Sequence, residues 1–312
     1  MGARAPSPPP SRVSWAPDQA VAAGGVPWAA ADHGRGPDGA GRGRLGAKPW
    51  AVHTVSGVVA LVGAGVIWVA LLGPVIALVT HLSGSAIVSS LTAPGALDPL
   101  VVSVTSGAVT LGVLLVVTTP LAWMMAHDRL PFPRVWEAGV LLSLLLPPLV
   151  IGLLLIFMVG PYTAIGQVLG RVHLSATNTF LALVIAEVYE SAPYYVLAAQ
   201  AAFRGVDRDL EQQGGLLGDR PIRVFRRVTL PLAMPGLATA LAVAWARAMG
   251  AFGAVIIIAY HPFGIPLQIY TTLQETGLAS ALPFALVLLV VALPLPLVAY
   301  AWSAHAGRRL RG

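Results

Sequence analysis

The sequence predicts an all-α polytopic membrane protein with about six transmembrane helices. Of its 312 residues, 56% are hydrophobic and only 10% are charged, whereas soluble domains carry about 25% charged residues. The charged residues fall between long apolar blocks, and several of these blocks exceed the roughly 20 residues that a helix needs to cross a bilayer. A soluble core of this composition would lack the polar surface to cover it.

Six apolar segments are long enough to be spans, and the third contains the pair Pro147-Pro148. We expect the spans at about Thr54–Thr80, Leu100–Ala126, Ala138–Gly160, Ala176–Ala202, Gly236–Tyr260 and Ala281–His305.

The basic residues indicate the topology. Seventeen of the nineteen Lys and Arg residues fall before the first span, between spans two and three, between spans four and five, or after the last span. Arg171 falls on the other side, and Arg247 lies within the fifth span. The positive-inside rule then places both termini in the cytoplasm of a cell-membrane protein. We therefore attribute the net charge of +6 to topology and expect no nucleic-acid partner.

Four regions follow from this pattern. Residues 1–50 are rich in Pro, Gly, Ala and Arg, which predicts a disordered cytoplasmic tail. Residues 51–98 carry the first span and an external loop, residues 99–305 carry the other five spans, and residues 306–312 form a cytoplasmic C-terminal tail.

The composition excludes several kinds of chemistry. Without cysteine, the chain has no thiolate metal site and no cysteine nucleophile. The only lysine, Lys48, precedes Pro49, so the chain lacks the Gly-Lys-Ser/Thr of a phosphate-binding loop. The seven histidines form no His-x-x-x-His pair, and we expect them to be interfacial or solvated. We predict no catalytic residue, no metal and no cofactor, and hence no enzyme.

The cytoplasmic loop at about residues 204–234 carries the most specific pattern. Leu210, Gln213 and Leu217 share one helical face, Gly218 is suited to end that helix, and Asp219 is suited to cap the next. Two short amphipathic helices joined by a glycine turn suit a loop that docks into a groove of a partner.

This loop resembles the cytoplasmic motif of permease subunits of ATP-binding-cassette importers: Glu-Ala-Ala, three residues, Gly, nine residues, Ile, one residue, Leu-Pro. The matching positions are Gly218, Val228, Leu230 and Pro231. The triplet departs from the pattern and reads Gln212, Gln213 and Gly214, with Glu211 just before it. The resemblance implies a fold like that of type I importer permeases and a coupling helix at residues 211–218 that contacts the ATP-hydrolysing subunit.

A second resemblance concerns the cargo. Residues 246–255 look like the fifth-helix motif of molybdate, tungstate and sulfate permeases, Ala-Arg-x-x-Gly-Glu-Phe-Gly-Ala, with Ala251 in place of Glu. Shorter matches lie at residues 119–123, 146–148 and 266–270. The resemblance covers roughly residues 99–305 and implies candidates for a translocation path at Arg247, Gly250, Phe252 and Gly253.

Charges inside the spans need partners. A charge at the bilayer centre costs on the order of 3 kcal/mol, so Arg247 must face a cavity, water or an acid. Glu187 and Glu190 in the fourth span are the available acids. Arg247 therefore either forms an ion pair with one of them or lines an anion path, and both roles can coexist; the two glutamates are path candidates as well.

The resemblances imply a permease subunit that works with cytoplasmic ATP-binding subunits, an extracytoplasmic substrate-binding protein and a second permease subunit, identical or related, within the membrane lipid. Two alternatives stay open. The same architecture serves other cargoes, such as iron, thiamine or polyamine. The buried acids would also suit a proton relay in an ion-coupled secondary transporter or a membrane enzyme.

Overall fold

The computed structural model describes residues 55–82 and 84–309, which are mainly helical with no strand among them. Five helices are long and apolar enough to cross a membrane, or six if one bent pair counts as a single span. The predicted fold class is thereby confirmed. The chain divides into two units, residues 1–63 and 64–312, and the predicted tail at residues 1–50 lies outside the described residues.

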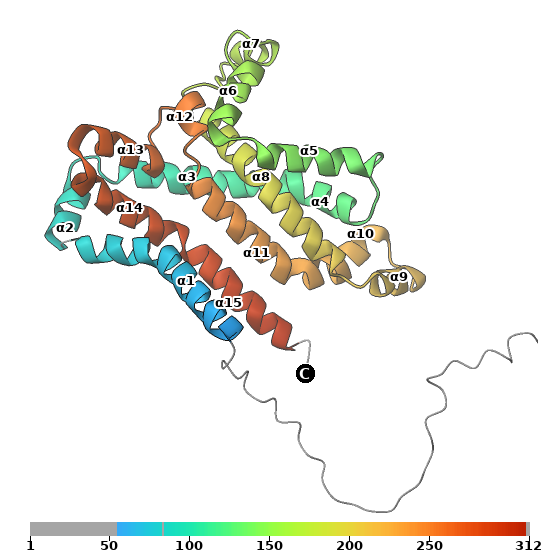
Figure 1. Cartoon of the computed structure of the whole chain (residues 1–312). Coiled ribbons are helices and arrows are strands. Elements are labelled where there is room, and N and C mark those ends of the chain that lie inside the picture. The colour runs from blue at the N-terminus through green and yellow to red at the C-terminus, as the bar shows by residue number, and fades with distance from the viewer. Residues whose placement is uncertain (1–54, 83, 310–312) are drawn as a thin grey trace, which may run out of the picture. The chain divides into compact units, whose positions relative to one another are not determined.

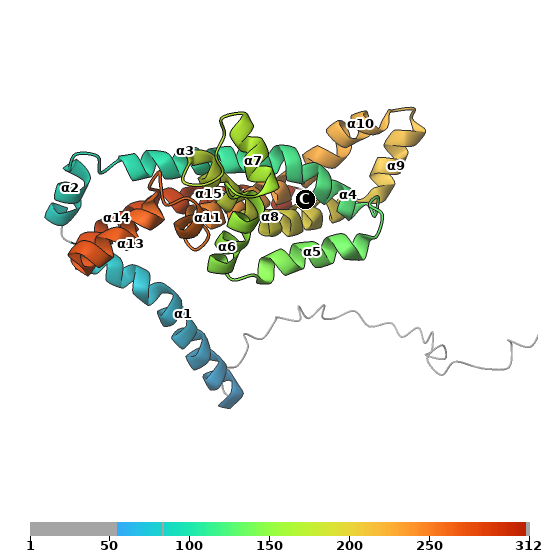
Figure 2. The ribbon, with the colours of Figure 1, turned by 90° about the horizontal axis from the view of Figure 1, so that it is seen from above.

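The helices follow one another with short connections (Figures 1 and 2). Their bounds are α1 Val55–His81, α2 Gly84–Thr92, α3 Asp98–Val113, α4 Thr119–Ala126, α5 Pro133–Leu145, α6 Pro148–Val159, α7 Ala164–Arg171, α8 Phe180–Arg204, α9 Arg208–Leu216, α10 Pro221–Val224, α11 Leu230–Met249, α12 Val255–Ile258, α13 Ile265–Thr276, α14 Leu278–Ala292 and α15 Pro294–Arg309. Two π-helical segments, η2 Leu114–Thr118 and η3 Phe225–Thr229, join α3 to α4 and α10 to α11.

Helix α8 is the central element of the second unit. It packs against α11, α4, α3 and α5, and Figure 1 shows it running beside them. Thr179 begins the helix, because its hydroxyl accepts a hydrogen bond from the Ala182 amide at 3.2 Å. Tyr195 and Phe203 are fully buried in the cluster that α8 forms with α4 and α11. The polar residues Glu187, Glu190, Ser191 and Gln200 of α8 are buried as well.

The third span differs from a single straight helix. The predicted segment consists of two helices, α5 and α6, which meet at an angle of 117°. The cause is Pro147-Pro148: the residue before each proline is driven to extended backbone, and neither proline can donate a helical hydrogen bond. Leu146 and Pro147 are both extended, with ψ of 132° and 138°.

The fifth span lies earlier than predicted. The helical run extends from Pro221 to Met249, so the predicted bounds of about Gly236–Tyr260 are wrong at both ends. Arg247 consequently lies in the last turn of α11 instead of midway along a span. At the C-terminus, α15 continues to Arg309, so residues 306–309 extend this helix instead of beginning a separate tail.

Both π-helical segments precede a proline by two residues, namely Pro120 and Pro231. Proline lacks the amide that would bond four residues back, and a local widening of the helix accommodates the missing bond. As a result, Leu230 and Pro231 lie at the beginning of α11 and not in a loop.

Candidate functional site

The loop that we predict to be cytoplasmic forms two short helices, α9 and α10. Asp207 caps α9 by accepting a hydrogen bond from the Asp209 amide at 2.9 Å. Gly218 follows α9 with φ of +86°, a left-handed conformation that side chains other than glycine rarely adopt. The prediction that Asp219 caps the next helix is wrong: Arg220 stands at the cap position, and the Asp219 carboxylate instead pairs with Arg223 at 2.8 Å.

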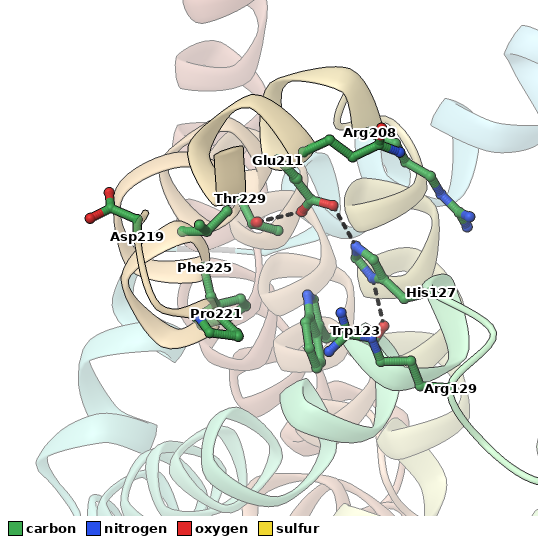
Figure 3. Close-up of a pocket in the computed structure, with 12 residues that line it drawn as sticks. Trp123, His127, Arg129, Arg208, Glu211, Asp219, Pro221, Phe225 and Thr229 are labelled. Atoms are coloured by element: carbon green, nitrogen blue, oxygen red, sulfur yellow. Dashed lines mark hydrogen bonds and ion pairs between the residues drawn. The ribbon is translucent and has the colours of Figure 1, made fainter. Parts of the chain in front are cut away.

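A cavity of about 340 Å³ separates this loop from the end of α4 (Figure 3). Its twelve lining residues are Trp123, His127, Arg129, Arg208, Glu211, Gln212, Gly215, Asp219, Pro221, Val224, Phe225 and Thr229. Glu211 points to two of them at once, because its carboxylate accepts a hydrogen bond from the Thr229 hydroxyl and lies 2.9 Å from Nε2 of His127. The predicted coupling segment is thus joined to two transmembrane helical runs.

Further contacts attach α9 to the end of α4. The Arg208 guanidinium donates to the Ala126 carbonyl at 3.0 Å and lies 3.5 Å from the Asp128 carboxylate. At the end of α4 itself, the Arg129 guanidinium lies over the Trp123 ring at 4.5 Å. Because Ala126 is the last residue of α4, the first of these bonds satisfies a carbonyl that the helix end leaves free.

The outward surface of α9 is open. Gln212 and Gln213 are exposed, and Gly214 packs against Val224 of α10, where an added Cβ would lie 3.2 Å from a valine methyl. Leu216 and Leu217 are each 87% exposed. Two adjacent, exposed leucines at the end of α9 are suited to contact another protein.

Deep in the membrane-spanning region, Glu187 is bound to α3. Its side chain is 3% exposed, and its two carboxylate oxygens accept hydrogen bonds from Ser106 at 2.7 Å and Thr110 at 2.9 Å. These donors lie four residues apart and so share one face of α3. Glu187 is therefore satisfied without a basic partner.

Of the two acids predicted as partners of Arg247, the structure selects Glu190. One Glu190 oxygen lies 4.0 Å from the guanidinium, and the other accepts a hydrogen bond from the Ala254 amide at 3.1 Å. The guanidinium also lies 4.6 Å from the centre of the Tyr194 ring. Its side chain is 39% exposed, and its Nε is buried without a hydrogen-bond partner. Arg247 is thus a loosely paired cation.

The remaining path candidates surround the loop after α11. Gly250 ends α11, and Phe252 packs against Tyr270 with ring centres 5.2 Å apart. Gly253 lies directly against Pro148 at the bend of the third span. Ala251 is 3% exposed within an apolar cluster, and the carboxylate that bonds this loop is that of Glu190 of α8, through the Ala254 amide.

Reasoning from the sequence missed several contributing residues. Ser106 and Thr110 carry a detectable signal, because two hydroxyls at helical spacing interrupt an apolar span. His127 carries none, and its placement corrects the expectation that every histidine is interfacial or solvated: its side chain is only 11% exposed and bonds Glu211, 84 residues later. No group of three metal-ligating side chains occurs within residues 55–82 and 84–309.

Comparisons with known proteins agree with this architecture. Residues 118–312 match the family of binding-protein-dependent transport system inner membrane components. The chain is 36% identical to a probable molybdenum ABC transporter permease protein of Haloferax volcanii, over 76% of this chain and 87% of the relative. It is 32% identical to the molybdenum transport system permease protein of Mycobacterium tuberculosis, over 73% and 87%.

A probable sulfate transport system permease protein of Nephroselmis olivacea is 30% identical over 74% of this chain and 82% of the relative. Among solved structures, a bacterial alginate ABC transporter, crystallised with an alginate-bound periplasmic protein, matches with a TM-score of 0.62 at 17% identity. That match covers 81% of this chain and 94% of the other, and it concerns the fold alone.

Proposed function

We propose that this chain, which belongs to the family of binding-protein-dependent transport system inner membrane components, imports a tetrahedral oxyanion such as molybdate, tungstate or sulfate. The assignment of the cargo rests on the similarity, over about three quarters of the chain, to relatives named for molybdenum and sulfate transport. A partly exposed, loosely paired arginine in the membrane-spanning region supports the same assignment.

Partner subunits supply the energy. The chain lacks a phosphate-binding loop, so cytoplasmic ATP-binding subunits hydrolyse ATP, and α9 with the exposed Leu216 and Leu217 is the surface that they engage. An extracytoplasmic binding protein delivers the cargo, and a second permease subunit completes the path. Both termini lie in the cytoplasm, as the distribution of basic residues favours.

The path runs past Arg247. Its guanidinium and the Glu190 carboxylate, 4.0 Å apart, attract each other with about 4 kcal/mol at an effective dielectric constant near 20, reduced by solvent because Arg247 is 39% exposed. An oxyanion that approaches Arg247 competes with Glu190 for the guanidinium. Because Glu190 competes for the guanidinium, the oxyanion binds Arg247 weakly enough to be released again.

The test is uptake of radiolabelled molybdate and sulfate into proteoliposomes that contain the permease, the ATP-binding subunits that co-purify with it, and the binding protein. Arg247→Ala is expected to lower ATP-dependent uptake at least about tenfold, a loss of ~1.4 kcal/mol, while Arg247→Lys retains more. Arg171→Ala, at an exposed external arginine, is the matched control and is expected to leave uptake unchanged.

Three outcomes contradict the proposal. Normal uptake by a well-expressed Arg247→Ala variant removes the residue from the path. Uptake of iron, thiamine or polyamine without oxyanion uptake replaces the cargo. Uptake that requires an ion gradient and proceeds without ATP points to a secondary transporter.

A further inference from the structure

We propose that His127 is a positioning residue of the transport cycle: its protonated imidazole bonds Glu211 and thereby holds α9 against the end of α4. This inference rests on the proposed function, in which α9 receives the motion of the ATP-binding subunits. His127 and Glu211 are only 11% and 16% exposed, and their contact spans 2.9 Å. The pair is therefore shielded from much of the solvent screening that weakens surface ion pairs.

The hydrogen-bond geometry places a proton between the two side chains. Nδ1 of His127 lies 2.9 Å from the Trp123 carbonyl oxygen, which can only accept. Nδ1 must then carry a hydrogen, and Nε2 faces Oε2 of Glu211. If neither group carried a proton at that contact, a nitrogen lone pair would oppose a carboxylate oxygen. A protonated ring donates from both nitrogens and satisfies both acceptors.

The helix ends favour the same charges. His127 stands at the C-terminus of α4, where the partial negative charge of the helix favours a cation. Glu211 lies in the first turn of α9, where the partial positive charge favours an anion. The Thr229 hydroxyl donates to the other Glu211 oxygen and orients the carboxylate.

The other charged groups around the ring have partners of their own. Asp128 pairs with Arg208, Asp219 pairs with Arg223, and Arg129 lies over the Trp123 ring. Glu211 is thus the carboxylate that the His127 ring faces among the described residues, as Figure 3 shows.

The contact between His127 and Glu211 joins α9 to the helical run that ends at Ala126. Helix α9 belongs to the exposed loop, whereas His127 ends the helical run Asp98–Ala126. The same run carries Ser106 and Thr110, which bond the buried Glu187. A displacement of α9 that is transmitted through His127, beside the contact of Arg208 with the Ala126 carbonyl, therefore reaches the run that holds the buried carboxylate.

The test measures transport per ATP hydrolysed in proteoliposomes with the complete complex. His127→Gln retains a hydrogen-bond donor but removes the charge, and it is expected to lower this ratio about tenfold, as expected for a lost charge-assisted hydrogen bond. His127→Arg keeps a cation and is expected to retain more of the ratio. The matched control is His81→Gln: His81 bonds the Ala77 carbonyl at 2.8 Å in the same way but contacts no carboxylate in the described chain.

Rescue by the conservative variant separates positioning from a merely structural role, because a merely structural loss lowers ATP hydrolysis and uptake together and leaves their ratio unchanged. Equal ratios for His127→Gln and His127→Arg overturn the proposal, and so does a wild-type ratio in His127→Gln. If both His127 variants fail to fold, Glu211→Gln tests the same contact from its other side. It is expected to lower the ratio to a similar extent, and a wild-type ratio in that variant overturns the proposal. Absence of any ATP-driven uptake by the wild type contradicts the proposed function instead.

Discussion

Gly253 is a position where the structure leaves no room for a side chain, so a substitution there should lower stability. A Cβ added there would lie 2.4 Å from Cβ of Pro148, 3.0 Å from its carbonyl carbon and 3.1 Å from the Leu149 amide nitrogen. Carbon atoms pack best at about 3.5–4.0 Å, so the overlap with Pro148 is about 1 Å. These atoms belong to a proline ring and to backbone, and none of them can rotate away. The bend between α5 and α6 would have to shift.

Gly253→Ala is therefore expected to lower the free energy of unfolding by about 1–3 kcal/mol. At roughly 2–4 °C per kcal/mol for a domain of this size, the melting temperature should fall by about 2–12 °C. The assay is thermal unfolding of the purified protein in detergent. Uptake should fall in parallel if the bend must keep its angle for the third span to pack.

Gly250→Ala is the matched control. The nearest atom to its added Cβ is the Ala246 carbonyl oxygen at 3.4 Å, an ordinary contact, and its φ of −92° suits alanine. Loss of a glycine from the unfolded chain should leave the protein unchanged or more stable by about 0.4–1 kcal/mol. Equal melting temperatures for the two variants would refute the reasoning from the close approach of Gly253 to Pro148.

Two further predictions concern the buried carboxylate and the loop. The double variant Ser106→Ala, Thr110→Val removes both donors from Glu187 and should cost about 1–3 kcal/mol of unfolding free energy, judged from hydrogen bonds in other membrane proteins. In a Glu187→Leu background the same double variant should cost much less, and additive losses in thermal unfolding would contradict the shared network. Gly218→Ala meets no neighbouring atom but forces alanine to φ of +86°; the strain of about 1–2 kcal/mol should speed limited proteolysis between α9 and α10 severalfold. An unchanged cleavage rate would argue against a strained turn.

Much of the architecture follows from local properties of the chain. In a bilayer, every backbone polar group must be paired within the protein, so an apolar block of sufficient length can only be helical when it spans alone. For this reason the helical character of the apolar segments was predictable from residue order. The turn at Gly218 was predictable too, because its left-handed backbone is a property of a single residue. The 117° bend was not, although Pro147-Pro148 marked its place, because a proline pair breaks a helix without specifying where the next one points.

The sequence by itself therefore determined an all-helical membrane protein and a loop with a glycine turn between two short helices. Only the tertiary structure decided which charges meet. Glu187 and Glu190 lie three residues apart on α8, yet Glu187 bonds two hydroxyls of α3, whereas Glu190 pairs with Arg247 of α11. Likewise, His127 and Glu211 are 84 residues apart. Such pairings depend on how each helix is rotated and how far it slides along its neighbours, and these two quantities are set by side-chain packing between segments that are distant in the chain.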